Sequence, residues 1–461
     1  MSSPSMKPRL RPTWVSGLLA LLAVAATGPA TAATYYLVQD LGALPGDSDS
    51  VATGINGQGN VVGWSNGPNG YRGFVYTDAG GMSALPGLPN RPRAFPRKIN
   101  DAGDIAGTAD AGGTDLGHAV RWQGGIPQDL GTLPTGPYSA AWGINNHGDV
   151  VGESTTQVNG INVVHAFVYT DALGMADLTP TSDTGVAHGI NDAGQIAGYK
   201  TAAGGYHAFR WDGAFQDLGV LPGMAHSFGY AIEPGGRIAG HSTSASGNTE
   251  RLFRFTDGTG LQNLGGTGEH NTAWGINAAG TVVGSLGQSA ARAFVYTDAA
   301  GLQNLNELID QSRGWVLQAA FDINTAGQIV GYGFNNFTRS THAVLLSPTT
   351  KRPPECSFNC LRSKSVNLTG ELMHNFANVD GKVMVKDENG GAVPQALVIA
   401  NWTRPDGSTE INNAWTNNKG SAKFNTSGGQ GTYALEVIGI VKSLYTFNPK
   451  RSVLSGNVDV P

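Results

Sequence analysis

The chain has 461 residues and a formal net charge of −5, and 14% of its residues are charged, against about 25% in an average globular domain. This balance argues against a protein that binds nucleic acid or an anionic membrane surface through bulk positive charge. Apolar residues make up 40% of the chain and glycine fills 67 positions, which favours sheets joined by tight turns over a disordered chain.

The N-terminus has the pattern of a secretory signal peptide. Basic residues from Lys7 to Arg11 precede the apolar run 14–26, and a small-residue cleavage site ends at Ala32. We therefore predict a signal peptide over residues 1–32 and a secreted or periplasmic mature chain. An N-terminal membrane anchor is the alternative, although the apolar run is short for a membrane span. No later segment is apolar enough for a transmembrane helix.

One motif recurs seven times over residues 33–350. Each copy reads Gly-Ile-Asn or a close variant, then a glycine-containing turn, then Val/Ile-x-Gly, as in GINGQGNVVG at 54–63. The motif isoleucines are Ile55, Ile99, Ile144, Ile190, Ile232, Ile276 and Ile323. The spacing of about 42 to 47 residues is typical of four-stranded propeller blades.

The two ends of the repeat array predict a closed ring. In the third copy we expect strands at 140–144, 149–152 and 165–169 and a fourth strand that ends at Asp177-Leu178. The last copy lacks this fourth strand, and a matching Asp-Leu-Gly segment lies at 35–44 instead. We therefore predict an all-β protein, with a seven-bladed β-propeller closed by its N-terminal strand. An open solenoid would instead need capping repeats.

The third strand of several copies carries His-Ala-Phe, as at His165-Ala166-Phe167 and His207-Ala208-Phe209. With the preceding turn motif, it resembles the HAF family of extracellular repeats. The resemblance implies an exported repeat protein and implies no reaction. In the fifth copy Glu233-Pro234 follows Ile232, and we expect a modified turn there.

The C-terminal part has a different pattern. We predict a linker at 351–364 and an Ig-like β-sandwich at 365–461, because short alternating strands are separated by turn residues. Residues 416–424 resemble bacterial Ig-like and carboxypeptidase-regulatory-like domains, which implies a role in display, spacing or adhesion. Cys356 and Cys360 are the two cysteines, and we predict a local disulfide between them. A metal site is the weaker alternative, since no histidine lies nearby.

The connections on one face of the propeller differ in length, whereas the turn inside the motif is constant. Loops of variable length on a rigid scaffold often bind ligands. We expect a ligand on this face, bound by aromatic, histidine and arginine side chains. The candidates are Tyr138, Trp142, His188, His226, Tyr230, His270, Trp274, Arg313 and Trp315. Alternatively, Trp142, Tyr230 and Trp274, which share one repeat position, pack between blades.

The remaining motifs do not indicate a cofactor or a metal. The repeated histidines lie in equivalent positions on separate blades, so we expect each to bond within its own blade: His118, His165, His207 and His342. Ser65 stands in a Gly-x-Ser-x-Gly pattern, but at a strand end rather than a strand-to-helix elbow, and we interpret this match as chance.

We predict an exported, monomeric, non-catalytic binding or adhesion protein that recognises an extracellular carbohydrate or a cell-surface protein. The alternative is a propeller enzyme of the polysaccharide lyase or hydrolase type, with His188 or His270 as the base at the channel mouth. A purely structural role also stays open.

Overall fold

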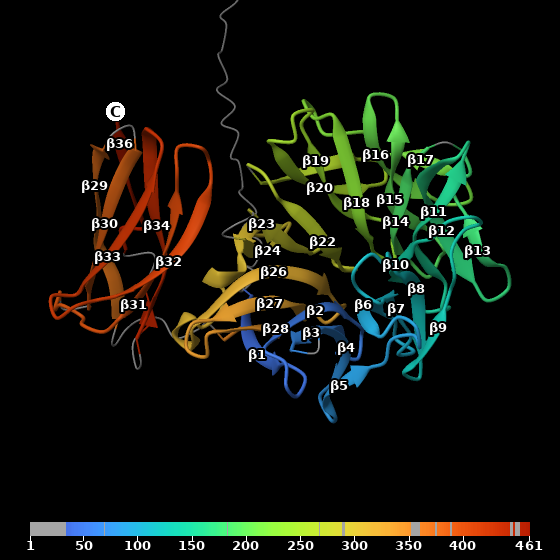
Figure 1. Cartoon of the computed structure of the whole chain (residues 1–461), viewed down its shortest axis with the longest axis horizontal. Coiled ribbons are helices and arrows are strands. Elements are labelled where there is room, and N and C mark those ends of the chain that lie inside the picture. Colours follow the sequence, from blue (N-terminus) through green and yellow to red (C-terminus); the bar gives the residue numbers. More distant parts are fainter. Residues whose placement is uncertain are drawn as a thin grey trace, which may run out of the picture. The chain divides into compact units, whose positions relative to one another are not determined.

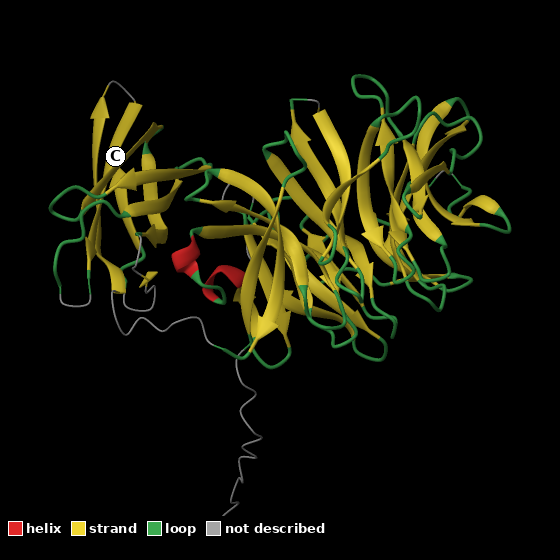
Figure 2. Ribbon diagram, turned by 90° about the horizontal axis from the view of Figure 1, so that it is seen from below, coloured by secondary structure: helices red, strands yellow, loops and turns green. Residues whose placement is uncertain are grey.

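The computed structural model describes residues 34–68, 70–181, 183–266, 268–287, 291–351, 360–373, 376–387, 390–442, 446–447 and 452–461. Strands form nearly all of the regular structure, drawn yellow in Figure 2. Two short 3-10 helices, η1 (Leu305–Glu307) and η2 (Gln311–Arg313), interrupt them. The predicted signal peptide and Cys356 lie outside the described residues, and only the backbone of Cys360 is described. The disulfide therefore stays a prediction.

Seven four-stranded antiparallel sheets form the propeller. Blade one comprises β2 (Asp49–Ile55), β3 (Val61–Gly67), β4 (Gly70–Thr77) and β5 (Gly81–Leu85). Blade two comprises β6 (Arg93–Ile99), β7 (Ile105–Asp110), β8 (His118–Gln123) and β9 (Ile126–Asp129). Blade three comprises β10 (Ser139–Ile144), β11 (Val150–Val158), β12 (Ile161–Thr170) and β13 (Gly174–Asp177). Blade four comprises β14 (Gly185–Ile190), β15 (Ile196–Ala202), β16 (Gly205–Trp211) and β17 (Phe215–Asp217).

The remaining three blades follow the same order. Blade five comprises β18 (His226–Ile232), β19 (Ile238–Thr243), β20 (Glu250–Thr256) and β21 (Gly260–Gly265). Blade six comprises β22 (Thr272–Ile276), β23 (Val282–Leu286), β24 (Arg292–Thr297) and β25 (Gly301–Asn304). Blade seven comprises β26 (Trp315–Ile323), β27 (Ile329–Asn335), β28 (Ser340–Thr349) and, from the N-terminus, β1 (Tyr35–Gly42). In each blade we call the strands A to D from the channel outward.

The N-terminal strand closes the ring, as predicted. In Figure 1, β1 lies beside β28, and the two pair antiparallel from Tyr35 opposite Thr349 onward. Oδ1 of Asp40 on β1 lies 2.9 Å from Nδ1 of His342 on β28. The same third-strand histidine contacts a fourth-strand aspartate within blades two, three and four. The repeated histidines therefore bond within their blades, and β1 supplies the partner that blade seven lacks.

The motif asparagines join neighbouring blades. In each of six blades the asparagine Oδ1 accepts the backbone N–H four residues later, which shapes the A–B turn. Its Nδ2 donates to the backbone carbonyl at the equivalent position of the next blade, over 2.9 to 3.4 Å. The members are Asn56, Asn100, Asn145, Asn191, Asn277 and Asn324. We call this the asparagine belt. It includes the ring closure, where Asn324 donates to Asn56.

Blade five keeps the turn but changes its chemistry. Glu233 Oε1 accepts the N–H of Arg237 over 3.0 Å, as the asparagines do, and Gly236 still takes a positive φ of 84°. A carboxylate has no N–H to donate, so it cannot reach the next blade in the same way. Arg237 replaces this donor, since its Nη2 lies 2.6 Å from the carbonyl oxygen of Ala278 in blade six. The expected modification thus concerns the side chains and leaves the backbone of the turn unchanged.

Contact between the inner strands explains the glycine that ends each motif. A Cβ atom on Gly63 of β3 would lie 2.0 Å from the carbonyl oxygen of Val51 and 2.8 Å from the ring of Phe74. Phe74 is itself fully buried, like the equivalent phenylalanines Phe167, Phe209, Phe253 and Phe294. The space that glycine leaves therefore admits a large ring to the core between blades.

The C-terminal domain is a sandwich of two four-stranded sheets. The first has the order β33 (Ser421–Gly428), β30 (Phe376–Lys386), β29 (Cys360–Met373) and β35 (Thr446–Phe447). The second has the order β32 (Thr409–Trp415), β31 (Leu397–Thr403), β34 (Gly431–Val441) and β36 (Ser455–Val460). Trp402 and Tyr433 are fully buried in the cluster between them. Because β29 begins at Cys360, residues 360–364 belong to a strand and not to the predicted linker.

The described residues include no helix that is long and apolar enough to cross a membrane.

Candidate ligand-binding site

Every inner strand of the propeller has a β-bulge at the same place. In each blade the residue two positions before the motif isoleucine falls between two paired residues and is left out of the A–B pairing. A bulge of this kind redirects a side chain. We call the seven bulged residues the channel ring: Thr53, Arg97, Trp142, His188, Tyr230, Trp274 and Phe321.

All seven members of the channel ring line one cavity of about 710 Å³. The cavity continues past the ring to Asp49, Asn66, Tyr71 and Thr341, which lie at the ends of strands next to the B–C and D–A connections. It therefore extends toward the face with loops of variable length. A volume of this size fits a ligand of several hundred daltons.

Six of the rings around the channel follow one another at contact distance. The centroid of the His188 ring lies 5.4 Å from Trp142 and 4.7 Å from Tyr230. Tyr230 lies 4.8 Å from Trp274, which lies 5.8 Å from Phe321. Tyr332, one strand further out, stacks on Phe321 at 6.0 Å. The result is a continuous aromatic wall over five blades.

Strand B adds a second row of side chains to the cavity wall. The residue after the motif glycine points to the cavity in four blades, and these residues are Trp64, Glu153, Tyr199 and Tyr332. Glu153 is held in place, because Oε1 accepts from Tyr138 Oη at 2.9 Å and from Trp142 Nε1 at 3.3 Å. Burial raises the pKa of Glu153 despite these two hydrogen bonds and the positive charge of Arg97.

Two ring residues have strongly altered electrostatics. Burial, together with the positive charges of Arg97 and His241, lowers the pKa of His188 to about 3, so its imidazole is neutral near pH 7. Burial also lowers the pKa of Arg97, against the negative potential of Tyr138 and Glu153. The guanidinium carbon of Arg97 lies 4.7 Å from the ring centroid of Trp142, a cation–π contact. Arginine keeps its charge in proteins, so the site holds a cation beside a neutral imidazole.

The structure brings some of the predicted site residues together and separates others. Trp142, His188, Tyr230 and Trp274 line the cavity, and Tyr138 reaches it through Glu153. The first four side chains border an open cavity. Packing between blades, the alternative for Trp142, Tyr230 and Trp274, is therefore not their only contact.

The other four predicted residues lie outside the cavity lining. His226 accepts the backbone N–H of Tyr206 with Nδ1 over 3.1 Å. The side chain of His270 is about half exposed, 3.8 Å from Glu269. Arg313 is 71% exposed and pairs with Asp310. Trp315 is buried, with 6% of its surface exposed. His226 and Trp315 begin the strands β18 and β26, and Arg313 ends η2. They follow connections of variable length, and the direction of their side chains depends on contacts that the repeat pattern does not encode.

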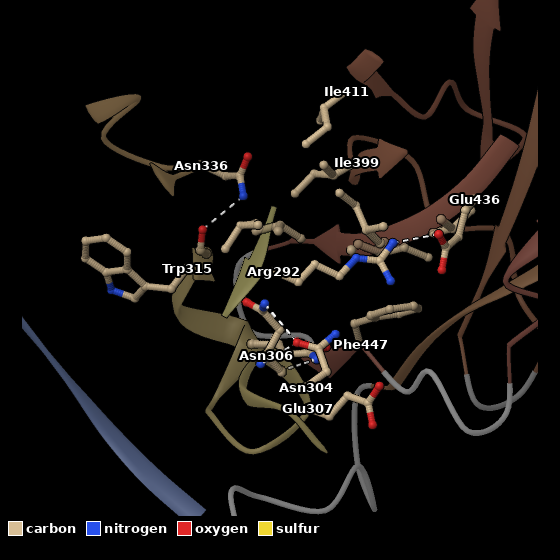
Figure 3. Close-up of a pocket in the computed structure, with 18 of the residues that line it drawn as sticks. Arg292, Asn304, Asn306, Glu307, Trp315, Asn336, Ile399, Ile411, Glu436 and Phe447 are labelled. Carbon is tan, nitrogen blue, oxygen red and sulfur yellow. Dashed lines mark hydrogen bonds and ion pairs between the residues drawn. The ribbon is translucent and has the colours of Figure 1, made fainter. Parts of the chain in front are cut away.

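Trp315 borders a second and much smaller cavity, shown in Figure 3. Its volume is about 80 Å³, room for only a few water molecules. Arg292 of β24 crosses it, and Nη2 donates to Oε2 of Glu436 on β34 over 2.6 Å (Figure 3). Ile399 and Phe447 also line it. This cavity is too small for the predicted ligand.

Arg97, Glu153, Tyr199 and Phe321 are among the cavity residues that the sequence patterns did not indicate. Arg97 and Phe321 stand at the same offset before the motif isoleucine as Trp142 and Tyr230, so comparison of that one position across all repeats would have found them. Glu153 and Tyr199 follow the motif glycine directly, and the same comparison identifies them. Within the described ranges, no group of three or more His, Cys, Asp and Glu side chains is arranged to hold a metal ion.

No known protein-family model and no curated protein matches this chain. Among solved structures, virginiamycin B lyase from Staphylococcus aureus is similar at 15% identity, covering 68% of this chain and 99% of that chain with a TM-score of 0.44. A putative gluconolactonase is similar at 13% identity, 69% and 94% coverage and a TM-score of 0.32. Prolyl oligopeptidase B from Galerina marginata follows at 8% identity, 72% and 53% coverage and 0.34. At these values the similarities carry no argument about activity.

Proposed function

We propose that this is an exported binding protein whose propeller channel takes a ring-shaped ligand of the carbohydrate class. One observation carries the proposal: seven bulged residues, one from each blade, converge on a single cavity of about 710 Å³ with an aromatic wall. Sugar rings stack their C–H faces on aromatic side chains, and a few polar groups then fix their orientation. The signal sequence predicted for residues 1–32 supports export.

The sandwich would then act as a spacer or an adhesion module, as the resemblance to Ig-like domains implies. A net charge of −5 gives no support to nucleic acid as a partner. A soluble glycan or the glycan of a cell surface is the partner that suits the channel chemistry, and we expect the protein to act as a monomer.

A second candidate function is elimination chemistry on the same ligand. The observation that favours it is the neutral imidazole of His188, whose ring centroid lies 4.7 Å from that of Tyr230. His188 would take a proton from the ligand and Tyr230, whose pKa is raised by burial, would give one to the leaving oxygen. An imidazole with a pKa of about 3 is a weak base and has little tendency to take a proton from the ligand. We therefore propose binding without reaction as the main function.

One experiment separates the two. The mature chain, residues 33–461, is incubated with a panel of soluble and insoluble polysaccharides, and both protein depletion and new unsaturated or reducing ends are measured. We expect depletion without product, and we expect Trp142→Ala and Tyr230→Ala to reduce it at least tenfold. Product release that stops in His188→Ala would establish the enzyme instead. Depletion that the two channel variants leave unchanged would rule out the channel as the site.

A further inference from the structure

Most of the charged side chains that line the cavity make a hydrogen bond or an ion pair within the protein. Lys98 Nζ lies 2.6 Å from Asp322 Oδ1. Asp49 accepts a hydrogen bond from Ser48 over 2.7 Å. Glu153 accepts from Tyr138 and Trp142. Arg97 is the exception, because its guanidinium makes no hydrogen bond or ion pair with any described residue.

The position of Arg97 makes this lack of partners unusual. Arg97 is the bulged residue of β6, between the paired residues Pro96 and Lys98, and its guanidinium lies over the ring of Trp142. Its Nε is buried and has no acceptor. A buried cation without hydrogen bonds is unfavourable unless an anion or water satisfies it. The contact with the Trp142 ring uses no hydrogen-bond acceptor, so the N–H groups of Arg97 stay available to a ligand.

The geometry of a guanidinium selects among anions. Its planar fork matches a carboxylate, which accepts two parallel N–H bonds. Arg97 is the one cation of the described cavity lining without an ion-pair partner, and a carboxylate would supply the two acceptors that its N–H groups lack. Among the described residues no hydrogen bond or ion pair joins Glu153 to Arg97, since Glu153 Oε1 accepts from Tyr138 and Trp142 instead.

We propose that the ligand of the channel carries a carboxylate which pairs with Arg97 while its ring stacks on the aromatic wall beside it; an acidic sugar has both features. This inference rests on the proposed function, since it names the class of carbohydrate that the same site takes. Trp142 would then have two roles: its ring holds the guanidinium, and it adjoins both His188 and the sugar.

The test compares trigalacturonate with its methyl ester, which has the same rings and no charge, by isothermal titration calorimetry on the mature chain. We expect the acid to bind at least tenfold more tightly than the ester. Arg97→Gln should remove this preference and Arg97→Lys should restore part of it. Arg313→Gln makes the same change at an exposed arginine outside the cavity, and it should leave both affinities unchanged. Thermal unfolding of each variant checks the fold.

The outcomes distinguish the two proposals. Equal binding of acid and ester, unchanged in Arg97→Gln, would overturn the carboxylate inference and leave a carbohydrate site in place. Failure of both probes at millimolar concentration would overturn the carbohydrate site as well. If Arg97→Gln does not fold, the affinities of the unsubstituted chain for the acid and for the ester still test whether the site prefers a carboxylate. Benzoate serves as a third probe: binding as tight as that of the acidic trimer would show that the site takes carboxylates without a sugar ring.

Discussion

Lys98 Nζ lies 2.6 Å from Asp322 Oδ1, although these residues belong to blades two and seven and the inner strand of blade one lies between them. The other carboxylate oxygen accepts the backbone N–H of Ile55 on that intervening strand, at 3.0 Å. In the other five blades the residue before the motif isoleucine is glycine or alanine. The side chains of Lys98 and Asp322 thus link three blades on the A–B turn side of Arg97.

We expect Asp322→Ala to lower the free energy of unfolding by about 2 kcal/mol, because it leaves a half-buried ammonium and one backbone N–H without an acceptor. Chemical denaturation of Asp322→Ala, Lys98→Ala and the double variant measures the coupling. We expect a coupling energy of about 1 kcal/mol or more. Fully additive single effects would mean that the pair does not stabilise the ring.

The asparagine belt gives a prediction about the side-chain amide. Asn100→Asp keeps the size of the side chain but replaces the N–H that points at the Asn145 carbonyl, 2.9 Å away, with an oxygen. Two acceptors would then face each other, and we expect a loss of about 2 kcal/mol in unfolding free energy. Asn413→Asp, at an exposed position of the sandwich, is the matched control and should be neutral within about 0.5 kcal/mol.

The contact between His342 and Asp40 predicts a pH dependence of ring closure. The hydrogen bond to Asp40 raises the pKa of His342, although burial opposes it. Burial alone would raise the pKa of Asp40, but hydrogen bonds from His342 and the Gly42 N–H lower it. The histidine contribution is complete below the unfolded pKa of 6.5 and disappears as pH rises through the higher folded value. The aspartate contribution disappears as pH falls below 3.8, through its lower folded value.

The stabilisation by this pair should therefore be largest between about pH 4 and 6.5. We expect His342→Gln to destabilise the protein more at pH 5 than at pH 8.5, by less than about 1 kcal/mol because the pair is partly exposed. Urea unfolding at the two pH values measures the difference. A loss that is equal at both would show that the closure does not depend on the charge of His342.

The electrostatics of the channel can be examined without a ligand. Arg97→Gln removes one of the positive charges that lower the pKa of His188. We expect the pKa of His188 to rise from about 3 but to stay below 6.5, since burial, the larger cause, remains. Histidine side-chain NMR signals followed during an acid titration report the change. His241 is an internal control: burial alone lowers its pKa to about 4, and that value should not move.

Much of the fold is predictable from repeated residues. An Asp-Leu-Gly segment at the N-terminus and its absence after the seventh motif indicate closure, because an unpaired strand edge needs a partner. Asn in six of the A–B turns and Gly in all seven indicate the hairpin, since the turn needs a side-chain acceptor and a positive φ. The start of the sandwich at Cys360 was not predictable to the residue, because no turn signal marks it.

The functional site was predicted only in part. Residues that share the motif offset, such as Trp142 and Tyr230, do converge in the channel. Trp315 begins β26 and His270 lies in the connection before β22, where contacts with neighbouring segments, and not the repeat, set the direction of the side chain. Trp315 became part of a buried cluster, and His270 remained at the surface.

By itself, the sequence determined the number of blades, their strand order and the closure of the ring, because these follow from local turn chemistry repeated at a constant period. Only the tertiary structure decided which side chains enter the channel, since a bulge in each inner strand turns a residue from the expected alternation toward the axis. It also decided that Lys98 pairs with Asp322, whereas Arg97 has no hydrogen-bond or ion-pair partner among the described residues. Lys98 reaches Asp322 because blades two and seven lie close together in the ring, although they are far apart in the chain.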